Sequence, residues 1–219
     1  MNSGTSGVEQ APIEHPHQKS STNPNPHSRN NNKMVGGGTT GMGTIGTKPT
    51  LLEVKPMKFL IMDAPRQANL HLYIKEMRKH SVTDVVRVCE PTYQGAELQA
   101  AGITLHEMEY PDGHSPPQPV IDRWLQLVDK TFYSESAQAT TNNNDGRSIA
   151  VHCVAGLGRA PVMVAIAMIE FANYDPVEAV SVIRRHRRGA INEKQLLYLE
   201  GYKRTYKKSG AESSCCTIS

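Results

Sequence analysis

The sequence predicts an α/β fold in which a central, mostly parallel sheet is flanked by helices. Short β-branched segments alternate with helical segments over residues 51–207, and that alternation is typical of parallel sheets covered on both faces. Residues 1–50 carry almost no large apolar side chains. Because such a segment cannot bury enough surface to offset its chain entropy, we expect a disordered N-terminal extension. One domain over residues 51–207 and a tail over residues 208–219 follow from this division.

Each expected element has its own local signal. The strands are short and rich in β-branched residues, as in the D-V-V-R-V-C segment of residues 84–89. The helices repeat apolar residues at a spacing of three or four, as Leu70, Ile74 and Met77 do. A polar, Asn-rich stretch at residues 135–146 predicts a surface loop. In chain order we expect strands at 51–55 and 58–62, a helix at 70–80, strands at 84–89 and 103–108, a helix at 119–132, a strand at 148–152, and helices at 160–172, 175–187 and 192–206.

The composition excludes several functional classes. The 219 residues include 24 Lys and Arg against 21 Asp and Glu, and this mild balance excludes a histone-like nucleic-acid binder. Four cysteines are too few for a disulfide scaffold, and since none forms C-x-x-C we expect neither a metal site nor a cofactor. The longest apolar stretch, residues 160–169, is far shorter than the ~20 residues that a membrane span needs.

The most informative segment is V-H-C-V-A-G-L-G-R-A-P at residues 151–161. A strand is expected to end at His152, and a loop with two glycines leads into a helix. Backbone N–H groups of such a loop and of a helix N-terminus converge on a tetrahedral oxyanion, whose oxygens Arg159 would clamp. The same positive field favours the thiolate of Cys153, which predicts a nucleophile for covalent phosphoryl transfer. The predicted phosphate-binding residues are Val154, Ala155, Gly156, Leu157, Gly158 and Arg159. The alternative is a structural cysteine with an arginine in a surface salt bridge.

A single carboxylate is the candidate for the general acid that a phosphatase needs. Asp112 lies in the Y-P-D-G-H-S-P-P loop of residues 110–117, between an expected strand and an expected helix. Parallel strands place the loops that follow them at one edge of the sheet, so Asp112 is expected to reach the Cys153 loop and protonate the leaving oxygen. The alternative is an ordinary turn aspartate before a glycine.

Three further residues have two interpretations each. Cys89 is expected to end a strand near Cys153, where it is either a redox partner or a small buried hydrophobic residue. His152 either tunes the thiolate or is a buried histidine with a hydrogen-bonded ring. Gln195 has the capping spacing with Asn192, and it is also placed to orient the hydrolytic water.

Four segments together resemble the phosphatase of regenerating liver family, also called protein tyrosine phosphatase type IVA. They are V-R-V-C-E-P-T-Y at residues 86–93, V-H-C-V-A-G-L-G-R-A-P-V at 151–162, R-R-G-A-I-N-E-K-Q-L-L-Y-L-E at 187–200, and the Cys-Cys pair at 215–216. The resemblance covers about residues 55–206 and the last four residues. Ala160 is a mark of that family, since most cysteine phosphatases have Ser or Thr after the loop arginine.

The resemblance implies a dual-specificity-like cysteine phosphatase fold and a mechanism. Cys153 would be the nucleophile that forms a cysteinyl-phosphate, Arg159 the phosphate clamp and Asp112 the acid. The substrates would be phosphotyrosine proteins or phosphoinositides. Cys89 would lock Cys153 in a disulfide under oxidation. Because Ala160 offers no hydroxyl to the departing thiolate, hydrolysis of the intermediate is expected to be slow.

The resemblance also implies a rival function without catalysis. The protein would be a pseudo-phosphatase that binds and regulates a cyclin-M-type magnesium transport mediator through the acid loop and Arg188. A sulfurtransferase or an arsenate reductase is a third alternative, which Asp112 and the single loop arginine disfavour.

The C-terminal tail carries signals for a membrane surface. Cys216-Thr217-Ile218-Ser219 is a C-a-a-X sequence, and its last two residues indicate farnesylation of Cys216. A single lipid chain binds a protein to a membrane only weakly. We therefore expect a second signal, a group of basic residues that is attracted to the anionic lipids of the inner leaflet. That signal consists of Lys203, Arg204, Lys207 and Lys208. We expect the protein on the cytoplasmic face of the plasma or endosomal membranes, and in the cytoplasm when unprenylated.

Overall fold

The computed structural model describes residues 43–134 and 146–206. The chain divides into two compact units, residues 1–39 and 40–219, and every described residue belongs to the second. The predicted loop at residues 135–146, apart from Gly146, lies outside the described residues, as do Lys207, Lys208, Cys215 and Cys216.

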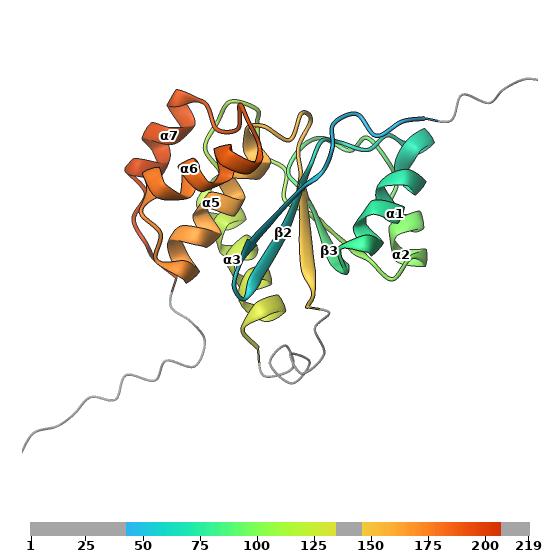
Figure 1. The fold of residues 1–219 in the computed structure, drawn as a ribbon, viewed down its shortest axis with the longest axis horizontal. Helices are drawn as coiled ribbons and strands as arrows, with labels where there is room; N and C mark the ends of the chain where they lie inside the picture. The colour runs from blue at the N-terminus through green and yellow to red at the C-terminus, as the bar shows by residue number, and fades with distance from the viewer. Residues whose placement is uncertain (1–42, 135–145, 207–219) are drawn as a thin grey trace, which may run out of the picture. The chain divides into compact units, whose positions relative to one another are not determined.

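Five strands form one sheet in the order β1-β2-β5-β3-β4 (Figure 1). β1 pairs antiparallel with β2, and every other neighbouring pair is parallel, which confirms the predicted mostly parallel sheet. The central strand β5 is buried along its whole length because it has neighbours on both sides and helices on both faces. The strands are β1 (Thr50–Val54), β2 (Met57–Met62), β3 (Val82–Arg87), β4 (Thr104–Glu107) and β5 (Ser148–His152).

Helices cover both faces of this sheet (Figure 1). One buried cluster joins α1 and α2 to one face around Leu70, Met77 and Leu98. The larger cluster joins the other helices to the opposite face around Phe59 and Trp124, and the Trp124 indole donates a 2.7 Å hydrogen bond to the Met163 carbonyl. The helices are α1 (Leu70–Lys79), α2 (Ala96–Ala100), α3 (Gln118–Phe132), α5 (Arg159–Ala172), α6 (Pro176–His186) and α7 (Glu193–Glu200), with a short 3-10 turn η1 (Gln67–Asn69).

Two expected boundaries and one missed helix need correction. The third strand runs from Val82 to Arg87, so Cys89 lies in a bend two residues after it and does not end the strand. The last helix ends at Glu200 and not at residue 206. The Glu170 carboxylate of α5 accepts hydrogen bonds from the Tyr202 hydroxyl and the Thr205 N–H, and these bonds hold the segment after Glu200 against α5 outside the helix. α2 was not expected, since five residues are too few to show a helical period.

The fold also begins earlier than residue 51. Gly46 donates its backbone N–H to the Tyr73 hydroxyl at 3.1 Å, and Thr47 donates its N–H to the Asp63 carboxylate at 2.9 Å. Residues 43–49 therefore pack on the domain and do not belong to the expected disordered extension. Backbone groups make most of these contacts, so the side-chain pattern of the sequence gives no sign of them.

Candidate active site

The loop that follows β5 lies at the middle of the carboxyl edge of the sheet. It runs from Cys153 to Arg159, where α5 begins, and Pro161 occupies the first turn of that helix. Cys153 is only 3% exposed, at the base of the loop. Arg159 and all residues of α5 up to Phe171 are buried, so the helix N-terminus is held firmly against this loop.

The carbonyl groups of the loop are bonded to groups outside it. In a planar trans peptide the N–H of the next residue points opposite to the carbonyl. Outward carbonyls therefore turn the N–H groups of the following residues toward the inside of the loop, above Cys153. The outward bonds run from Ala64 N to Val154 O at 3.0 Å, from Arg187 Nε to Gly156 O at 2.6 Å and from Ile191 N to Leu157 O at 2.7 Å.

Gly156 permits this curl. Its φ is +68°, and a Cβ built on it would lie 2.3 Å from the Met62 carbonyl oxygen and 2.5 Å from Arg187 Nη2. Both the dihedral angle and the space exclude a side chain at this position.

Arg159 is 1% exposed and is held by two backbone carbonyls. Its Nη1 donates to the Tyr110 carbonyl at 3.0 Å and to the Val88 carbonyl at 3.3 Å, while the Tyr110 hydroxyl donates back to the Arg159 carbonyl at 3.0 Å. This reciprocal pair joins the loop that carries Asp112 (residues 110–117, the acid loop) to the loop that carries Cys153 (residues 153–159, the phosphate loop). The guanidinium group is therefore fixed in place before any anion binds.

The structure brings Asp112 to this arginine. Its carboxylate Oδ1 lies 3.1 Å from Arg159 Nε, although that nitrogen has no aligned hydrogen-bond acceptor among the described residues. The Asp112 side chain is 76% exposed, so water weakens the pair and leaves the carboxylate free to move. Glu90, which sequence reasoning did not single out, is a second carboxylate at this site, 3.7 Å from Nη1.

Cys89 and Cys153 are both free thiols in one buried cluster. Burial raises the pKa of Cys89 to about 11, although the nearby Arg159 charge acts in the opposite direction. Cys89 is therefore a protonated thiol at neutral pH. Its burial agrees with the simpler interpretation from sequence. Cys153 is also close enough to act on the pKa of Cys89, as the redox interpretation requires.

The structure favours the buried-histidine interpretation of His152. The ring is fully buried, and its Nε2 shares a 2.8 Å hydrogen bond with the Tyr93 hydroxyl. Burial lowers the pKa of His152 to about 3, so the ring is neutral at physiological pH and brings no positive charge to the neighbouring Cys153.

Both interpretations of Gln195 agree with its position. Its Oε1 accepts from the Asn192 N–H at 3.0 Å, and its own N–H donates to Asn192 Oδ1 at 2.9 Å, which forms the predicted capping box. Its Nε2 lies against the phosphate loop, since a Cβ on Gly158 would be only 3.0 Å from it. The cap occupies the oxygen end of the amide, and the nitrogen end lies against Gly158.

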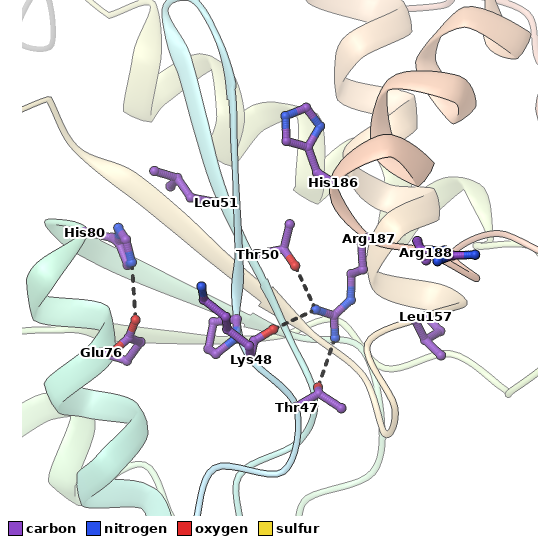
Figure 2. Close-up of a pocket in the computed structure, with 11 residues that line it drawn as sticks. Thr47, Lys48, Thr50, Leu51, Glu76, His80, Leu157, His186, Arg187 and Arg188 are labelled. Atoms are coloured by element: carbon purple, nitrogen blue, oxygen red, sulfur yellow. Dashed lines mark hydrogen bonds and ion pairs between the residues drawn. The ribbon is translucent and has the colours of Figure 1, made fainter.

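Arg187 is the positioning residue that sequence reasoning missed. It is only 6% exposed, and its guanidinium group donates a 2.6 Å hydrogen bond to the Gly156 carbonyl of the loop. Figure 2 shows its bonds on the other side, to the segment of residues 47–50. Besides Gly156, its guanidinium group donates to the Ala155 carbonyl at 3.4 Å, to the Lys48 carbonyl at 3.2 Å and to the Thr50 hydroxyl at 3.0 Å. Burial lowers the pKa of Arg187 from its ordinary value, but an arginine starts so high that it stays charged. One side chain thus joins the phosphate loop to the N-terminal segment.

Neither a metal centre nor a membrane-spanning helix is found in the part of the chain that the structure describes. Over residues 43–134 and 146–206, no three His, Cys, Asp or Glu side chains gather as metal ligands. Within those same ranges, every helix is too short or too polar to cross a bilayer.

Comparisons with known proteins agree with this site. The family model for protein-tyrosine phosphatase matches residues 64–200. A probable protein tyrosine phosphatase type IVA A of Dictyostelium discoideum is 46% identical over 166 residues, which cover 76% of this chain and 91% of the relative. The PRL-1 phosphatase of Drosophila melanogaster is 47% identical over 171 residues, with the same two coverages.

A solved structure shares the fold as well as the sequence. A putative protein tyrosine phosphatase from Leishmania major superposes with a TM-score of 0.65 at 40% identity, covering 72% of this chain and all of that one. The α/β sheet with a Cys-x5-Arg loop at its carboxyl edge is thus the cysteine-phosphatase fold that the sequence predicts. The chain belongs to the protein-tyrosine phosphatases, in the type IVA or PRL-1 family, and is a cysteine-dependent phosphatase.

Proposed function

We propose that the protein hydrolyses phosphotyrosine in proteins through a phosphocysteine at Cys153. The observation that carries the proposal is the set of loop carbonyls bonded outward, since planar peptides then direct the loop N–H groups inward. Those N–H groups and Arg159 would hold the phosphoryl oxygens. The Cys153 thiolate attacks phosphorus, the bond from phosphorus to the tyrosyl oxygen breaks, and Asp112 gives its proton to the leaving oxygen.

Water then completes the reaction. Asp112, now a carboxylate, accepts a proton from water as the water oxygen attacks phosphorus, and inorganic phosphate leaves the Cys153 thiolate behind. The Nε2 end of Gln195 is close enough to Gly158 to orient that water. In the structure Asp112 is paired with Arg159, and a bound phosphate would take over the guanidinium group and release the carboxylate for these proton transfers.

We propose that this second step is slow. Ala160 is fully buried beside Arg159, and its methyl group offers no hydrogen bond to the sulfur. The thiolate therefore leaves phosphorus without the help of a hydroxyl donor. Phosphoenzyme should accumulate during turnover.

We also propose that peroxide turns the site off reversibly. The Cys153 thiolate attacks peroxide and becomes a sulfenic acid, and the Cys89 thiol then displaces water to give a Cys89–Cys153 disulfide. The pairing is supported by the electrostatic effect of Cys153 on the buried Cys89 thiol, which requires the two groups to lie close together. Thiol reductants would restore the two free cysteines.

A membrane location completes the proposal. Farnesylation of Cys216, together with the basic residues before it, would hold the protein at the cytoplasmic face of plasma or endosomal membranes. Loss of membrane binding in a Cys216→Ser variant expressed in cells tests this part.

The test of the catalytic proposal is intact mass spectrometry during turnover of an aryl phosphate. Wild type should gain one phosphoryl group, and a Cys153→Ser variant should gain none and release no aryl alcohol. A Cys89→Ser variant is the matched control, since it loses a neighbouring thiol and should still form the adduct. If wild type shows neither adduct nor turnover, the binding role without catalysis, with a magnesium transport mediator as partner, becomes the better description.

A further inference from the structure

We propose that a cationic cleft beside the phosphate loop binds a second anionic side chain of the substrate, an acidic or phosphorylated residue close to the phosphotyrosine in sequence. This inference rests on the proposed function, because the phosphotyrosine itself would occupy the Cys153 loop.

The cleft has a volume of about 720 Å³ and lies between the carboxyl ends of α1 and α6 (Figure 2). Residues 47–49, which lead into β1, and the first two residues of β1 form its floor. Leu157 of the phosphate loop lines the cleft, and so does Arg187, which bonds the Gly156 carbonyl of that loop. The cleft is therefore directly next to the site of reaction.

The lining carries unpaired positive charge. Lys48 on the floor and Arg188 after α6 are both exposed, and neither has a carboxylate partner among the residues that the structure describes. The acidic side chain in the described lining, Glu76, is already matched, because its carboxylate lies 2.6 Å from Lys79 Nζ and 3.5 Å from His80 Nε2. Cations gathered around a hollow without a counter-ion attract an anion.

A peptide fits the surroundings of the cleft better than a lipid headgroup does. Thr50 and Leu51 belong to β1, which is an edge strand of the sheet, and an edge strand presents backbone groups to an extended chain. Successive residues of such a chain rise about 3.3 Å each, so a side chain a few positions from the phosphotyrosine would arrive over Lys48. Lys48 also lies outside residues 64–200, which match the family model, so the floor of the cleft is not part of the shared phosphatase core.

Peptide binding to the full-length Cys153→Ser protein tests the inference without interference from turnover. Two phosphotyrosine peptides of one sequence are compared at 0.15 M salt, one with neutral flanks and one with phosphoserine placed two to four residues from the phosphotyrosine. The second peptide should bind about five- to tenfold more tightly, the effect expected for two or three partly exposed charges. Lys48→Glu should remove most of this preference, so that the two peptides bind with similar affinity, and Arg188→Glu should reduce the preference.

Lys75→Glu is the matched control, because it makes the same change of charge on an exposed residue of α1 that does not line the cleft. Because salt screens a charge at that position, the ratio of the two peptide affinities should stay as it is in the Cys153→Ser protein. The inference is overturned if the two peptides bind equally well, if Lys48→Glu and Arg188→Glu keep the ratio, or if Lys75→Glu loses it too. A soluble inositol phosphate that competes more strongly than the doubly phosphorylated peptide, and does so only with Lys48 present, would assign the cleft to a lipid headgroup and overturn it as well.

Failure of the proposed function has a different signature. In that case the singly phosphorylated peptide does not bind either, and wild type forms no phosphocysteine. If only the cleft inference fails, the singly phosphorylated peptide still binds and only the preference is missing.

Discussion

Gly156 is the residue at which one added methyl group should reduce stability and activity most. In Gly156→Ala the new Cβ meets the Met62 carbonyl, and the positive φ adds strain of about 1–3 kcal/mol. We expect a lower Tm and a loss of at least about 100-fold in kcat/KM for an aryl phosphate, because the loop must shift. Gly201→Ala is the control, since that glycine has helical dihedral angles and its nearest neighbour to a new Cβ is 3.6 Å away. Equal stability and activity of both variants would contradict the assignment.

Arg187→Lys keeps the charge and removes the planar fork that bonds several acceptors at once. We expect kcat/KM to fall about 10- to 100-fold, with vanadate inhibition weakened by a similar factor, because the loop N–H groups lose their positioning. Arg185→Lys, in the last turn of α6, is the control, since that side chain is exposed. A vanadate inhibition constant that stays at the wild-type value would show that Arg187 does not position the loop.

The lowered pKa of the buried His152 should make the stability of the protein depend on pH. Burial holds its pKa at about 3 in the folded protein, below the ordinary value of about 6.5. Between these values the unfolded chain binds a proton that the folded protein does not, so the free energy of unfolding falls as pH drops below about 6.5, by at most about 1.4 kcal/mol per pH unit from this residue. Urea unfolding at several pH values measures the slope. His152 ring NMR signals that titrate between pH 5 and 8 would contradict the neutral, buried ring.

At the scale of elements, α5 carries a specific contact at each end. Its N-terminus supports the phosphate loop, and near its C-terminus Glu170 accepts from the Tyr202 hydroxyl at 2.7 Å. Tyr202→Phe should lower the free energy of unfolding by about 1.5–3 kcal/mol, the range for a hydrogen bond to a charged group. Tyr174→Phe should change it by less than about 0.5 kcal/mol, since its hydroxyl has no hydrogen bond within the described residues. Chemical denaturation compares the two, and equal effects would contradict the role of Glu170.

The elements also show what can be predicted from the sequence. Cys153, Arg159 and Asp112 could be placed together in advance, because parallel strands deliver the loops that follow them to one edge of the sheet. Arg187 could not be identified, since it lies among other arginines of the same chemistry. It turns inward because α6 ends at His186 and the chain leaves the helix at Arg187, with φ at −136°. That end is set by tertiary packing, which no local pattern reports.

At the scale of the whole molecule, the N-terminal boundary is testable by truncation. Deleting residues 1–42 should leave Tm and aryl phosphate turnover unchanged. Deleting residues 1–49 removes the Thr47 N–H that bonds Asp63 and the Lys48 carbonyl that bonds Arg187, and it should lower Tm by about 5–15 °C and reduce turnover. Calorimetry and an aryl phosphate assay check both. Identical behaviour of the two truncated proteins would return the boundary to residue 51.

The docking of residues 202–206 sets the direction from which a tethered enzyme would meet its targets. Tyr206 packs on Phe171 with ring centroids 5.2 Å apart, at the end of α5 farthest from Cys153. Since the 14 residues of α5 rise about 21 Å, Tyr206, from which the chain runs on to the proposed lipid anchor, lies on the side of the domain away from the sulfur. If the enzyme is anchored through this tail, its active site would lie some distance above the bilayer surface. It would then favour phosphotyrosines on cytoplasmic segments that project from the membrane. Vesicle-bound protein that cleaves headgroup phosphates as fast as soluble peptides would refute this geometry.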